Sequence, residues 1–561
     1  MWFNSASLDS LRLVRPNSFS GSPVLRSTMT TMPNLDLQAA WTYHNATKHS
    51  SSSIRTNPHF LDWANQPLSF NIYPKLEPLT LPREVRESGV AALSAIAETI
   101  HPNNAVPDLN SISQLLYFSA GITRRRTYPG GQLYFRAAAC TGALYEIELY
   151  FTCGSLAGLE AGLYHFAPAD FGLRRLRTGD HRGVLVEATA AEPSIAHAPL
   201  IVICTGTYWR NAWKYQARTY RHFGWDNGTL LANLLAMSTA LDLPAKIVCG
   251  FVDAEINRLL DLDTQREVAF SLVAIGHVAE PPPSAPTEIP PLRLETVPLS
   301  RKEVDYPAMR EFHAASSLLS PEEVAAWRGE TPIAIIKGPA GKVVPLEPPE
   351  PAEVPHDPIE RVILRRGSTR QFAREPITFA QLSTLLDRTI RGVPADFLDP
   401  FGAQLNQLYL IVHAVKGLCP GAYFFHRERR ALELLKEGDF RSQAGYLGLE
   451  QDLPADASVA VFLLADLQAI LERFGNRGYR SVQLEAGVIG GKLYLGAYGL
   501  GLGATGLTFY DDEVVRFFSP HAAGKSTIFL VALGKSAKRR RALRTGGAAR
   551  CSWLSGQFAR R

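Results

Sequence analysis

Apolar residues follow two kinds of pattern along the chain. Continuous apolar runs predict buried strands at residues 199–204, 270–275 and 527–532. Spacings of three and four residues place a second set on one face of a helix: Leu230, Leu234, Ser238 and Leu241. Because helical stretches precede the last two strand runs, the pattern predicts an α+β fold.

Two blocks of the sequence repeat each other at a spacing of 259 residues. The pairs that define this offset are Gly158 and Gly417, Gly179 and Gly438, Tyr220 and Tyr479, Gly228 and Gly487, and Asp253 and Asp512. A constant offset indicates one supersecondary unit used twice without net insertion. Two copies are too few for a solenoid and suit a fused dimer with pseudo-twofold symmetry inside one chain.

The helix predicted over residues 481–498 of the second block is rich in glycine. It contains Gly487, Gly490, Gly491 and Gly496. Each glycine inside a helix costs about 1 kcal/mol relative to alanine. Their concentration predicts a close approach of another backbone, that of the partner repeat.

Proline-rich sequence separates the two blocks. One cluster begins at Ala279 and a second covers residues 345–358, and proline removes the backbone donors that a sheet requires. Between the clusters, residues 321–327 predict a short helix with proline in its first turn. We therefore expect a disordered tail, a first repeat, a linker, a second repeat and a basic tail at residues 1–40, 41–278, 279–355, 356–545 and 546–561.

Composition and charge exclude several classes of protein. Hydrophobic residues make up 46% of the 561 positions and the formal net charge is +5, as in an ordinary globular protein. Basic residues concentrate near the carboxy-terminal end without interleaved aromatic residues, which favours a solvated end over a nucleic-acid site. No apolar run approaches the ~18–20 residues that span a bilayer, so no membrane attachment is expected.

The six cysteines predict neither a metal site nor a disulfide framework. No two of them form a C-x-x-C pair, and Cys204 and Cys249 lie in apolar runs where a thiol packs as a small hydrophobic group. Reduced cysteines indicate a cytoplasmic protein.

Two glycine motifs resemble nucleotide-binding loops without their context. Residues 501–506 fit G-x-G-x-x-G, but a dinucleotide loop follows a strand and opens a helix, whereas here the order is reversed. A helix end and turn explain these glycines. Residues 524–526 read Gly-Lys-Ser, yet Ser519 stands where a P-loop needs its first glycine, so a nucleoside-triphosphate site is not expected.

A basic motif opens the second block. Arg366, Ser368 and Arg370 place two cations and a hydroxyl within five residues, a spacing that suits a phosphate and an anionic ring edge. A solvated basic helix start explains the same residues, and their spacing alone leaves both interpretations open.

The wider segment resembles a known flavin motif. Residues 366–372, followed by Pro-Ile-Thr at 376–378 and Gln-Leu at 381–382, are similar to R-x-S-x-[RK]-x-F of the nitroreductase superfamily. The resemblance covers residues 41–278 and 356–535 and implies two FMN-dependent nitroreductase-like repeats packed as an intrachain pseudo-dimer. It also implies that Arg366, Ser368 and Arg370 contact FMN.

Residues 136–150 of the first block resemble a loop of SagB/ThcOx-type dehydrogenases, a branch of that superfamily, with the pattern R-x-x-P-S-x-G-A-L-Y-P-x-E-x-Y. There the loop reaches the flavin across the dimer interface, which implies cofactor contacts for Arg136, Cys140, Thr141 and Gly142. Cys140 replaces the serine of the pattern and Glu146 its second proline, so Thr141 would supply the hydroxyl. A turn of small residues before a strand is the alternative.

Residues 213–221 resemble the W-K-Y-x-x-R-x-Y-R element of SagB-type enzymes, whose Lys-Tyr pair is implicated in proton transfer. A lysine whose pKa is lowered by burial, helped by a phenol, can remove the proton that accompanies hydride loss. The matching residues of the second repeat, Arg473 and Phe474, are not competent bases. Lys214 and Tyr215 are therefore either a single catalytic pair or an ordinary amphipathic helix start.

Two further groups of residues follow from the resemblance. Gly506, Leu507 and Thr508 occupy the place where nitroreductases bring a backbone N–H toward the flavin ring. Lys538 and Arg539 follow the last strand, where basic residues of the family reach the FMN phosphate. A structural turn and a disordered basic tail are the respective alternatives.

Each repeat lacks what the other retains, which predicts one shared FMN per chain at the interface between the repeats. The resemblance implies an FMN-dependent oxidoreductase that moves two electrons to or from a small molecule or peptide heterocycle. It allows NAD(P)H as electron donor, partner proteins in a biosynthetic complex, and a monomer that is itself the fused pair; Lys214 and Tyr215 favour a dehydrogenase. The alternative is a flavin-less degenerate repeat pair with a structural or partner role.

Overall fold

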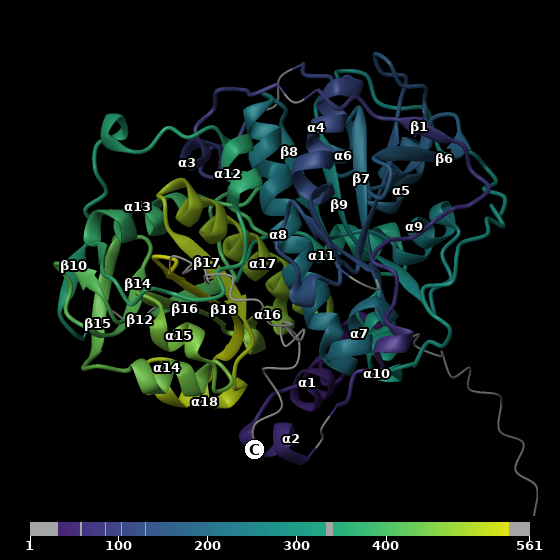
Figure 1. Ribbon diagram of the computed structural model, residues 1–561. Coiled ribbons are helices and arrows are strands. Elements are labelled where there is room, and N and C mark those ends of the chain that lie inside the picture. Colours follow the sequence, from purple (N-terminus) through teal and green to yellow (C-terminus); the bar gives the residue numbers. More distant parts are fainter. Residues whose placement is uncertain are drawn as a thin grey trace, which may run out of the picture. The chain divides into compact units, whose positions relative to one another are not determined.

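Antiparallel strands form the two large sheets of the protein (Figure 1). The computed structural model describes residues 32–56, 59–84, 86–101, 104–128, 131–332 and 340–537. Within these residues each large sheet has seven strands, and every pairing in both sheets is antiparallel. Together with the helices, these sheets confirm the mixed α and β class that the apolar pattern predicts.

The two sheets have corresponding strand orders. The first sheet runs β1 (Pro78–Thr80), β6 (Gly172–Thr178), β5 (Gly162–Ala167), β4 (Ile147–Cys153), β7 (Leu200–Thr207), β9 (Glu267–Ile275) and β8 (Ala245–Val248). The second runs β10 (Val343–Pro345), β15 (Ala431–Glu437), β14 (Gly421–His426), β12 (Asn406–Val412), β16 (Val459–Ala465), β18 (Ser526–Gly534) and β17 (Gly503–Leu507).

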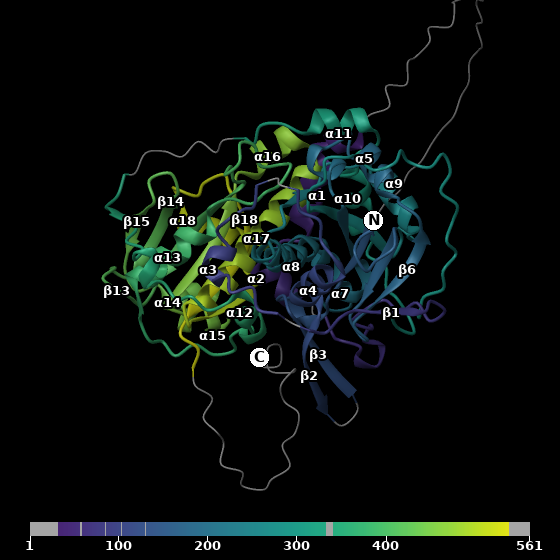
Figure 2. The same cartoon turned by 90° about the horizontal axis from the view of Figure 1, so that it is seen from above.

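Two smaller sheets have two strands each: β2 (Ile122–Tyr128) pairs with β3 (Gly131–Arg136), and β11 (Ile377–Thr378) with β13 (Val415–Lys416). The β2–β3 hairpin projects from the first half (Figure 2), and its residues from Arg124 to Tyr128 are exposed. It has no counterpart between α13 (Phe379–Thr389) and β12 in the second half, where the described chain contains no further strand.

Matching strands begin 259 residues apart. This offset separates β4 from β12, β5 from β14, β6 from β15, β7 from β16, and β9 from β18. The offset is 258 residues for β8 and β17, and for the helices α9 (Asp253–Leu260) and α18 (Asp511–Phe518). Compared with the first half, the second half therefore has one residue fewer before β17 and one residue more between α18 and β18.

This shift corrects one of the sequence pairs. The counterpart of Asp253 is Asp511 and not Asp512, because Asp253 and Asp511 each begin a helix 258 residues apart and each bind two buried arginines. Asp512 is exposed and pairs with Lys48. Because residues 511 and 512 are both aspartates, the sequence alone could not show which of them corresponds to Asp253.

The helices of the first half, up to residue 278, are α1 (Leu37–Ala46), α2 (Ser51–Thr56), α3 (Ala92–Ala95), α4 (Leu109–Ala120), α5 (Arg182–Ala188), α6 (Pro193–Ala196), α7 (Tyr208–Tyr215), α8 (Thr219–Ala240) and α9. Those of the second half, from residue 356, are α12 (Ile359–Arg365), α13 (Phe379–Thr389), α14 (Arg441–Leu447), α15 (Asp452–Asp456), α16 (Leu467–Phe474), α17 (Arg477–Gly499) and α18. Short 3-10 turns are η1 (Pro33–Leu35), η2 (Trp63–Asn65), η3 (Thr141–Ala143), η4 (Gln216–Arg218) and η5 (Pro351–Glu353).

The long helices α8 and α17 pack along each other and join the two halves (Figure 1). Glycines make this approach close: a Cβ on Gly487 would lie 2.5 Å from Trp225 O, and a Cβ on Gly491 would lie 2.5 Å from the Cβ of Ala232. The predicted close approach of the partner repeat is thus confirmed at these two positions. Gly490 instead makes room for Phe529 of its own half.

Two buried ion clusters cross between the halves. Arg477 and Arg480 of the second half donate to Asp253 of the first at 2.5 and 2.7 Å. Reciprocally, Arg218 and Arg221 of the first half donate to Asp511 of the second, at 3.0 and 2.6 Å. Charges this deeply buried require their partners, so each cluster fixes one half against the other.

The proline-rich segment contributes more structure than a linker. It contains α10 (Pro307–Ala315), α11 (Pro321–Trp327) and β10, and β10 forms the edge of the second sheet, where the proline that ends it needs no sheet donor. The predicted helix at 321–327 is confirmed, with Ser320 as its N-cap. At the amino-terminal end, α1 begins at Leu37 and buries Ala40, so ordered structure starts before residue 41.

Among the described residues, no helix is long and apolar enough to cross a membrane. The described cysteines all have free thiols; Cys204 and Cys249 are buried as predicted, and Cys419 is exposed. Cys551 lies outside the described residues.

Candidate functional site

Arg366 joins the two halves at the candidate site. Its backbone N–H ends α12 by donating to Val362 O, and its side chain crosses to the segment that follows β3 in the first half. There Nε donates to the carbonyl oxygen of Ala137 at 3.1 Å, and Nη2 donates to that of Arg136 at 3.2 Å. Burial lowers the pKa of this guanidinium, and no ion pair within the described residues gives it a carboxylate partner.

Ser368 and Gly506 meet at a phenol. The Oγ of Ser368 lies 3.2 Å from the Oη of Tyr494 on α17, and the backbone N–H of Gly506 donates to the same Oη at 2.5 Å. The guanidinium carbon of Arg366 lies 5.8 Å from the centre of the Tyr494 ring. Tyr494 therefore links the basic motif to the turn at the end of β17.

Lys214 of the first half lies within electrostatic reach of Arg370 of the second half. Lys214 lies in the last turn of α7, with its Nζ 5.3 Å from the centre of the neighbouring Tyr215 ring. Burial lowers the pKa of the Lys214 amine, and the positive charge of Arg370 lowers it further. The charge of the loop that carries Arg366 and Ser368 therefore acts on the end of α7.

Tyr215 packs against the Gly142 turn. Gly142 has φ +64°, and a Cβ at this position would lie 3.0 Å from the Oη of Tyr215. Burial raises the pKa of the Tyr215 phenol, as do the nearby carboxyl group of Asp226 and thiol of Cys140. The predicted Lys-Tyr pair and glycine loop are thus in contact.

Cys140 and Thr141 bind Asp226 of α8. Thr141 donates to this carboxylate from its backbone N, at 2.8 and 2.9 Å, and from its Oγ1, at 2.9 Å. The Sγ of Cys140 lies 3.4 Å from Oδ2 of the same carboxylate. The hydroxyl hydrogen of Thr141 is therefore engaged within the first half.

Arg136 is buried, and its side chain makes its contacts within the first half. Its Nη2 donates to Ser69 O at 2.5 Å, and its guanidinium carbon lies 5.0 Å from the centre of the Tyr145 ring. Tyr145 in turn accepts a hydrogen bond from the backbone N of Arg136 at 3.0 Å. These contacts fix the segment whose carbonyl groups bind Arg366.

The remaining predicted residues lie at or beyond the end of β17. Leu507 packs against the small apolar cluster of Phe372, Ala457 and Ala532, and Thr508 has a buried Oγ1 without a hydrogen-bond partner. Lys538 and Arg539 lie outside the described residues. The chain just before them runs beside the motif loop, since Ala537 N donates to Gln371 O at 2.9 Å.

The corresponding place on the other side of the molecule is built from different contacts. There the segment 394–396, the counterpart of 135–137, lies directly on β8: Ile247 N donates to Pro394 O, and Asp396 N donates to Ile247 O. The carboxylate of Asp396 accepts hydrogen bonds from Cys249 N and Gly250 N. Across the described chain, no hydrogen bond joins residues 135–137 to β17, so the two sides differ.

Arg473 and Phe474, the counterparts of Lys214 and Tyr215, have structural contacts. Arg473 donates to the carbonyl oxygens of Glu330, Trp327 and Arg328. Phe474 packs against Trp327 with ring centres 5.3 Å apart. The second half therefore uses these positions to bind α11 and the residues after it.

Sequence reasoning missed Tyr494, Tyr145 and Asp226. Tyr494 lies in a helix that is buried along almost its whole length, so its position carried no distinguishing pattern. Asp226, a buried acid in α8, was the more visible signal, because a carboxylate among buried apolar residues requires partners.

Comparison with known proteins identifies the second half. Residues 363–535 match the model of the nitroreductase family. A protein of Methanocaldococcus jannaschii whose name proposes nitroreductase activity is 27% identical over 172 residues, which are 31% of this chain and 82% of that protein.

Similarity to one solved structure extends over both halves. The crystal structure of a protein from Anabaena variabilis, also named as a proposed nitroreductase, superimposes with a TM-score of 0.71 and 26% identity, covering 89% of this chain and 99% of that one. A chain of the E. coli microcin synthetase McbBCD complex with truncated pro-MccB17 bound gives a TM-score of 0.29, with 18% identity over 44% of this chain and 94% of that one. Residues 363–535 thus match the nitroreductase family, and the fold of the chain resembles that of the Anabaena variabilis protein over most of its length.

Proposed function

We propose that the protein is an FMN-dependent oxidoreductase whose two halves are nitroreductase-like repeats packed as a pseudo-dimer around one shared site. The observation that carries this proposal is the pair of hydrogen bonds from Arg366 to the carbonyl oxygens of Ala137 and Arg136. They join the basic motif of one half to the glycine loop segment of the other. A cofactor held by either segment would therefore touch both.

The residues at this place fit FMN in charge and hydrogen bonding. Arg366, Arg370 and Lys214 are three cations for which the described ion pairs include no carboxylate, and together they suit an anionic group. Ser368 adds a hydroxyl group, and the unpartnered Oγ1 of Thr508 lies two residues beyond Gly506. A phosphate and an electron-rich ring are groups that such donors bind.

When bound, FMN would supply two-electron transfer. The chain's own contribution is to hold the cofactor and to move a proton. Lowering the pKa of Lys214 increases the fraction of neutral amine that can accept a proton from substrate. Tyr215, held between the Gly142 turn and the ring of His222, would orient that amine.

One cofactor per chain is the stoichiometry that these contacts favour. On the opposite side, segment 394–396 covers β8, and Arg473 and Phe474 bind α11 and the chain beyond it. The basic motif is not repeated in the first half, and Arg473 and Phe474 stand where Lys214 and Tyr215 would be needed. We therefore assign a single redox site, made from the second half's basic motif and the first half's Gly142 turn and Lys-Tyr pair.

The substrate class follows from the same pair of residues. A base beside the cofactor favours a dehydrogenase that acts on a small molecule or a peptide heterocycle, with NAD(P)H or another donor serving the reverse direction. Proteins of a biosynthetic complex are the partners that a peptide substrate would require. The fused pair would itself be the functional unit.

The test is the cofactor content of the purified full-length chain. After incubation with FMN and gel filtration, one equivalent of FMN per polypeptide supports the proposal. Two equivalents would contradict the single site. Failure to bind FMN would favour the flavin-less degenerate pair with a structural or partner role.

A further inference from the structure

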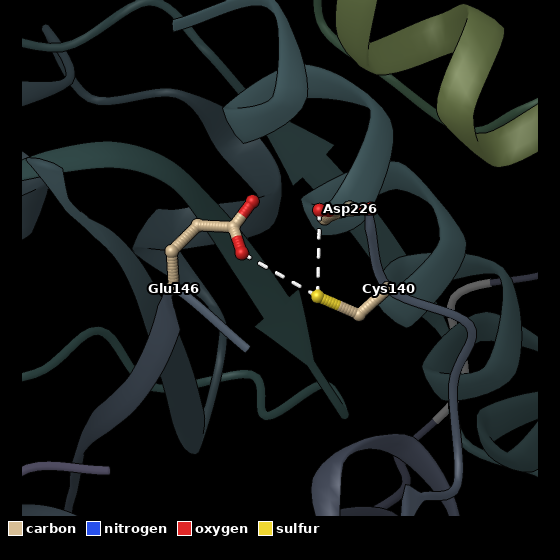
Figure 3. Close-up of side chains that lie close together, drawn as sticks. All are labelled: Cys140, Glu146 and Asp226. Atoms are coloured by element: carbon tan, nitrogen blue, oxygen red, sulfur yellow. Dashed lines mark hydrogen bonds between the residues drawn. The ribbon is translucent and has the colours of Figure 1, made fainter. Parts of the chain in front are cut away.

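Three acidic side chains meet inside the first half, beside the candidate redox site. Figure 3 shows the thiol of Cys140 between the carboxyl groups of Glu146 and Asp226. The Sγ lies 3.4 Å from Glu146 Oε2 and 3.4 Å from Asp226 Oδ2. Glu146 is fully buried and Asp226 is 6% exposed.

The cluster contains more hydrogen-bond acceptors than donors. A thiol has one hydrogen for the two carboxyl groups, and the sulfur also accepts a hydrogen bond from the backbone N of Tyr145 at 3.0 Å. The second oxygen of Glu146, Oε1, is buried and receives no hydrogen bond from an N–H or hydroxyl donor. A buried carboxyl oxygen without such a donor is a position that a cation can occupy.

The counterpart of Asp226 in the second half is a buried acid whose carboxyl group accepts several hydrogen bonds. Glu485 occupies the equivalent position, 259 residues later, and its Oε2 accepts hydrogen bonds from Leu405 N, Asn406 N and Asn406 Nδ2. Asp399 and Leu405 stand at the positions of Cys140 and Glu146, so no thiol and no second buried acid are supplied there. The three-acid cluster is therefore specific to the first half.

We propose that Cys140, Glu146 and Asp226 bind a divalent transition metal ion, of which zinc is the best match. Thiolate and carboxylate oxygens are ligands that zinc accepts, with distances of about 2.3 Å to sulfur and about 2.0 Å to oxygen. Tetrahedral geometry then places sulfur and oxygen about 3.5 Å apart. Both sulfur-to-oxygen distances in the cluster are 3.4 Å.

The surroundings suit such an ion in charge and in access. Three anionic ligands and a divalent ion leave one negative charge, and Arg136, which lines the same cavity as Cys140 and Asp226, carries a positive charge. A small cavity opens onto the cluster, lined by Cys140 and Asp226 together with Ala138, Tyr145 and Leu230. This cavity would leave room for a water molecule as the fourth ligand of the ion.

The ion would hold the turn from Cys140 to Glu146 against α8. Gly142, within that turn, contacts Tyr215. The metal site would therefore support one wall of the candidate redox site, although its ligands all belong to the first half. The C-x-x-C spacing that sequence reasoning required is absent because only one ligand is a cysteine.

Metal binding is tested with zinc and two readouts that do not depend on FMN. The full-length chain is stripped with a chelator, incubated with zinc, gel-filtered, and examined by elemental analysis and by X-ray absorption at the zinc edge. We expect one zinc per chain with one sulfur at about 2.3 Å and oxygens at about 2.0 Å. No retained zinc, or a coordination shell without sulfur, would overturn the site.

Variants assign the ligands. Cys140→Ser and Glu146→Gln should weaken zinc binding at least tenfold, a range seen when metal-site ligands or their supports are replaced. Cys419→Ser, which removes the exposed thiol, should leave binding unchanged. Loss of zinc in Cys419→Ser, or full retention in Cys140→Ser, would contradict the proposal. Since Gln keeps the shape of Glu, normal zinc binding by a folded Glu146→Gln protein would also contradict the proposal.

Discussion

The Nε of Arg366 lies 3.1 Å from the carbonyl oxygen of Ala137, a residue 229 positions earlier in the chain. The bond brings the loop after α12 into contact with the segment after β3. Each of these segments resembles a different part of a flavin site, and neither is complete alone. The proposed chemistry therefore depends on how the two halves pack.

A first prediction concerns the charge that acts on Lys214. Because the positive charge of Arg370 lowers the pKa of Lys214, Arg370→Ala should raise that pKa toward the ordinary value of about 10.4. The pH dependence of amine labelling, followed at Lys214 by mass spectrometry, measures this change.

The matched control is Arg374→Ala, which removes an exposed arginine of the same segment that pairs with Asp456. It should leave the labelling curve of Lys214 in place. An identical curve for the wild type and Arg370→Ala would show that the charge of Arg370 does not act on Lys214.

A second prediction concerns the ion clusters between the halves. Asp253→Asn removes the countercharge of two arginines that are fully buried, Arg477 and Arg480, and should lower the free energy of unfolding by about 3–5 kcal/mol. Urea denaturation followed by circular dichroism measures the loss.

Asp512→Asn is the control for this cluster, because Asp512 is exposed and pairs only at the surface with Lys48. Its effect should stay below about 1 kcal/mol. Equal losses of unfolding free energy in the two variants would contradict the assignment of Asp511, rather than Asp512, as the counterpart of Asp253.

A third prediction concerns pH. Burial raises the pKa of Glu485 to about 7, whereas an unfolded glutamate titrates near 4.3. The folded state therefore keeps its proton while the unfolded state loses it, and the stability present below about pH 4 declines as pH rises to about 7.

Glu485→Gln removes this titration. Its stability relative to the wild type should increase with pH between about 4 and 7, by up to about 3 kcal/mol, and then level off. Urea midpoints across that range measure the difference. A pH-independent difference would mean that Glu485 is already ionised in the folded protein.

Much of the fold could be predicted from the sequence because its signals are local. The strand predicted at 199–204 overlaps β7, those at 270–275 and 527–532 fall within β9 and β18, and the helix at 321–327 coincides with α11. The concentration of glycines also predicted the close approach of the other half to α17. These features need only the period of the chain and the size of a side chain.

The site was less predictable because it depends on contacts between distant residues. The basic motif and the glycine loop could be found by resemblance, but the phenol of Tyr494 that links Ser368 to Gly506 follows from the packing of α17. Likewise, Cys140, Glu146 and Asp226 are separated in sequence and meet only because the Gly142 turn folds against α8. No local pattern encodes such a meeting.

The most direct test of the shared site is FMN binding by Arg366→Ala beside Arg365→Ala. Arg365 is the adjacent arginine, but it is exposed and paired with Asp357. Loss of a charge-assisted contact worth about 1.5–3 kcal/mol should weaken FMN binding by at least about tenfold in Arg366→Ala, with an unchanged circular dichroism spectrum. Arg365→Ala should bind FMN like the wild type. Wild-type affinity in a folded Arg366→Ala protein would contradict a cofactor site shared between the two halves.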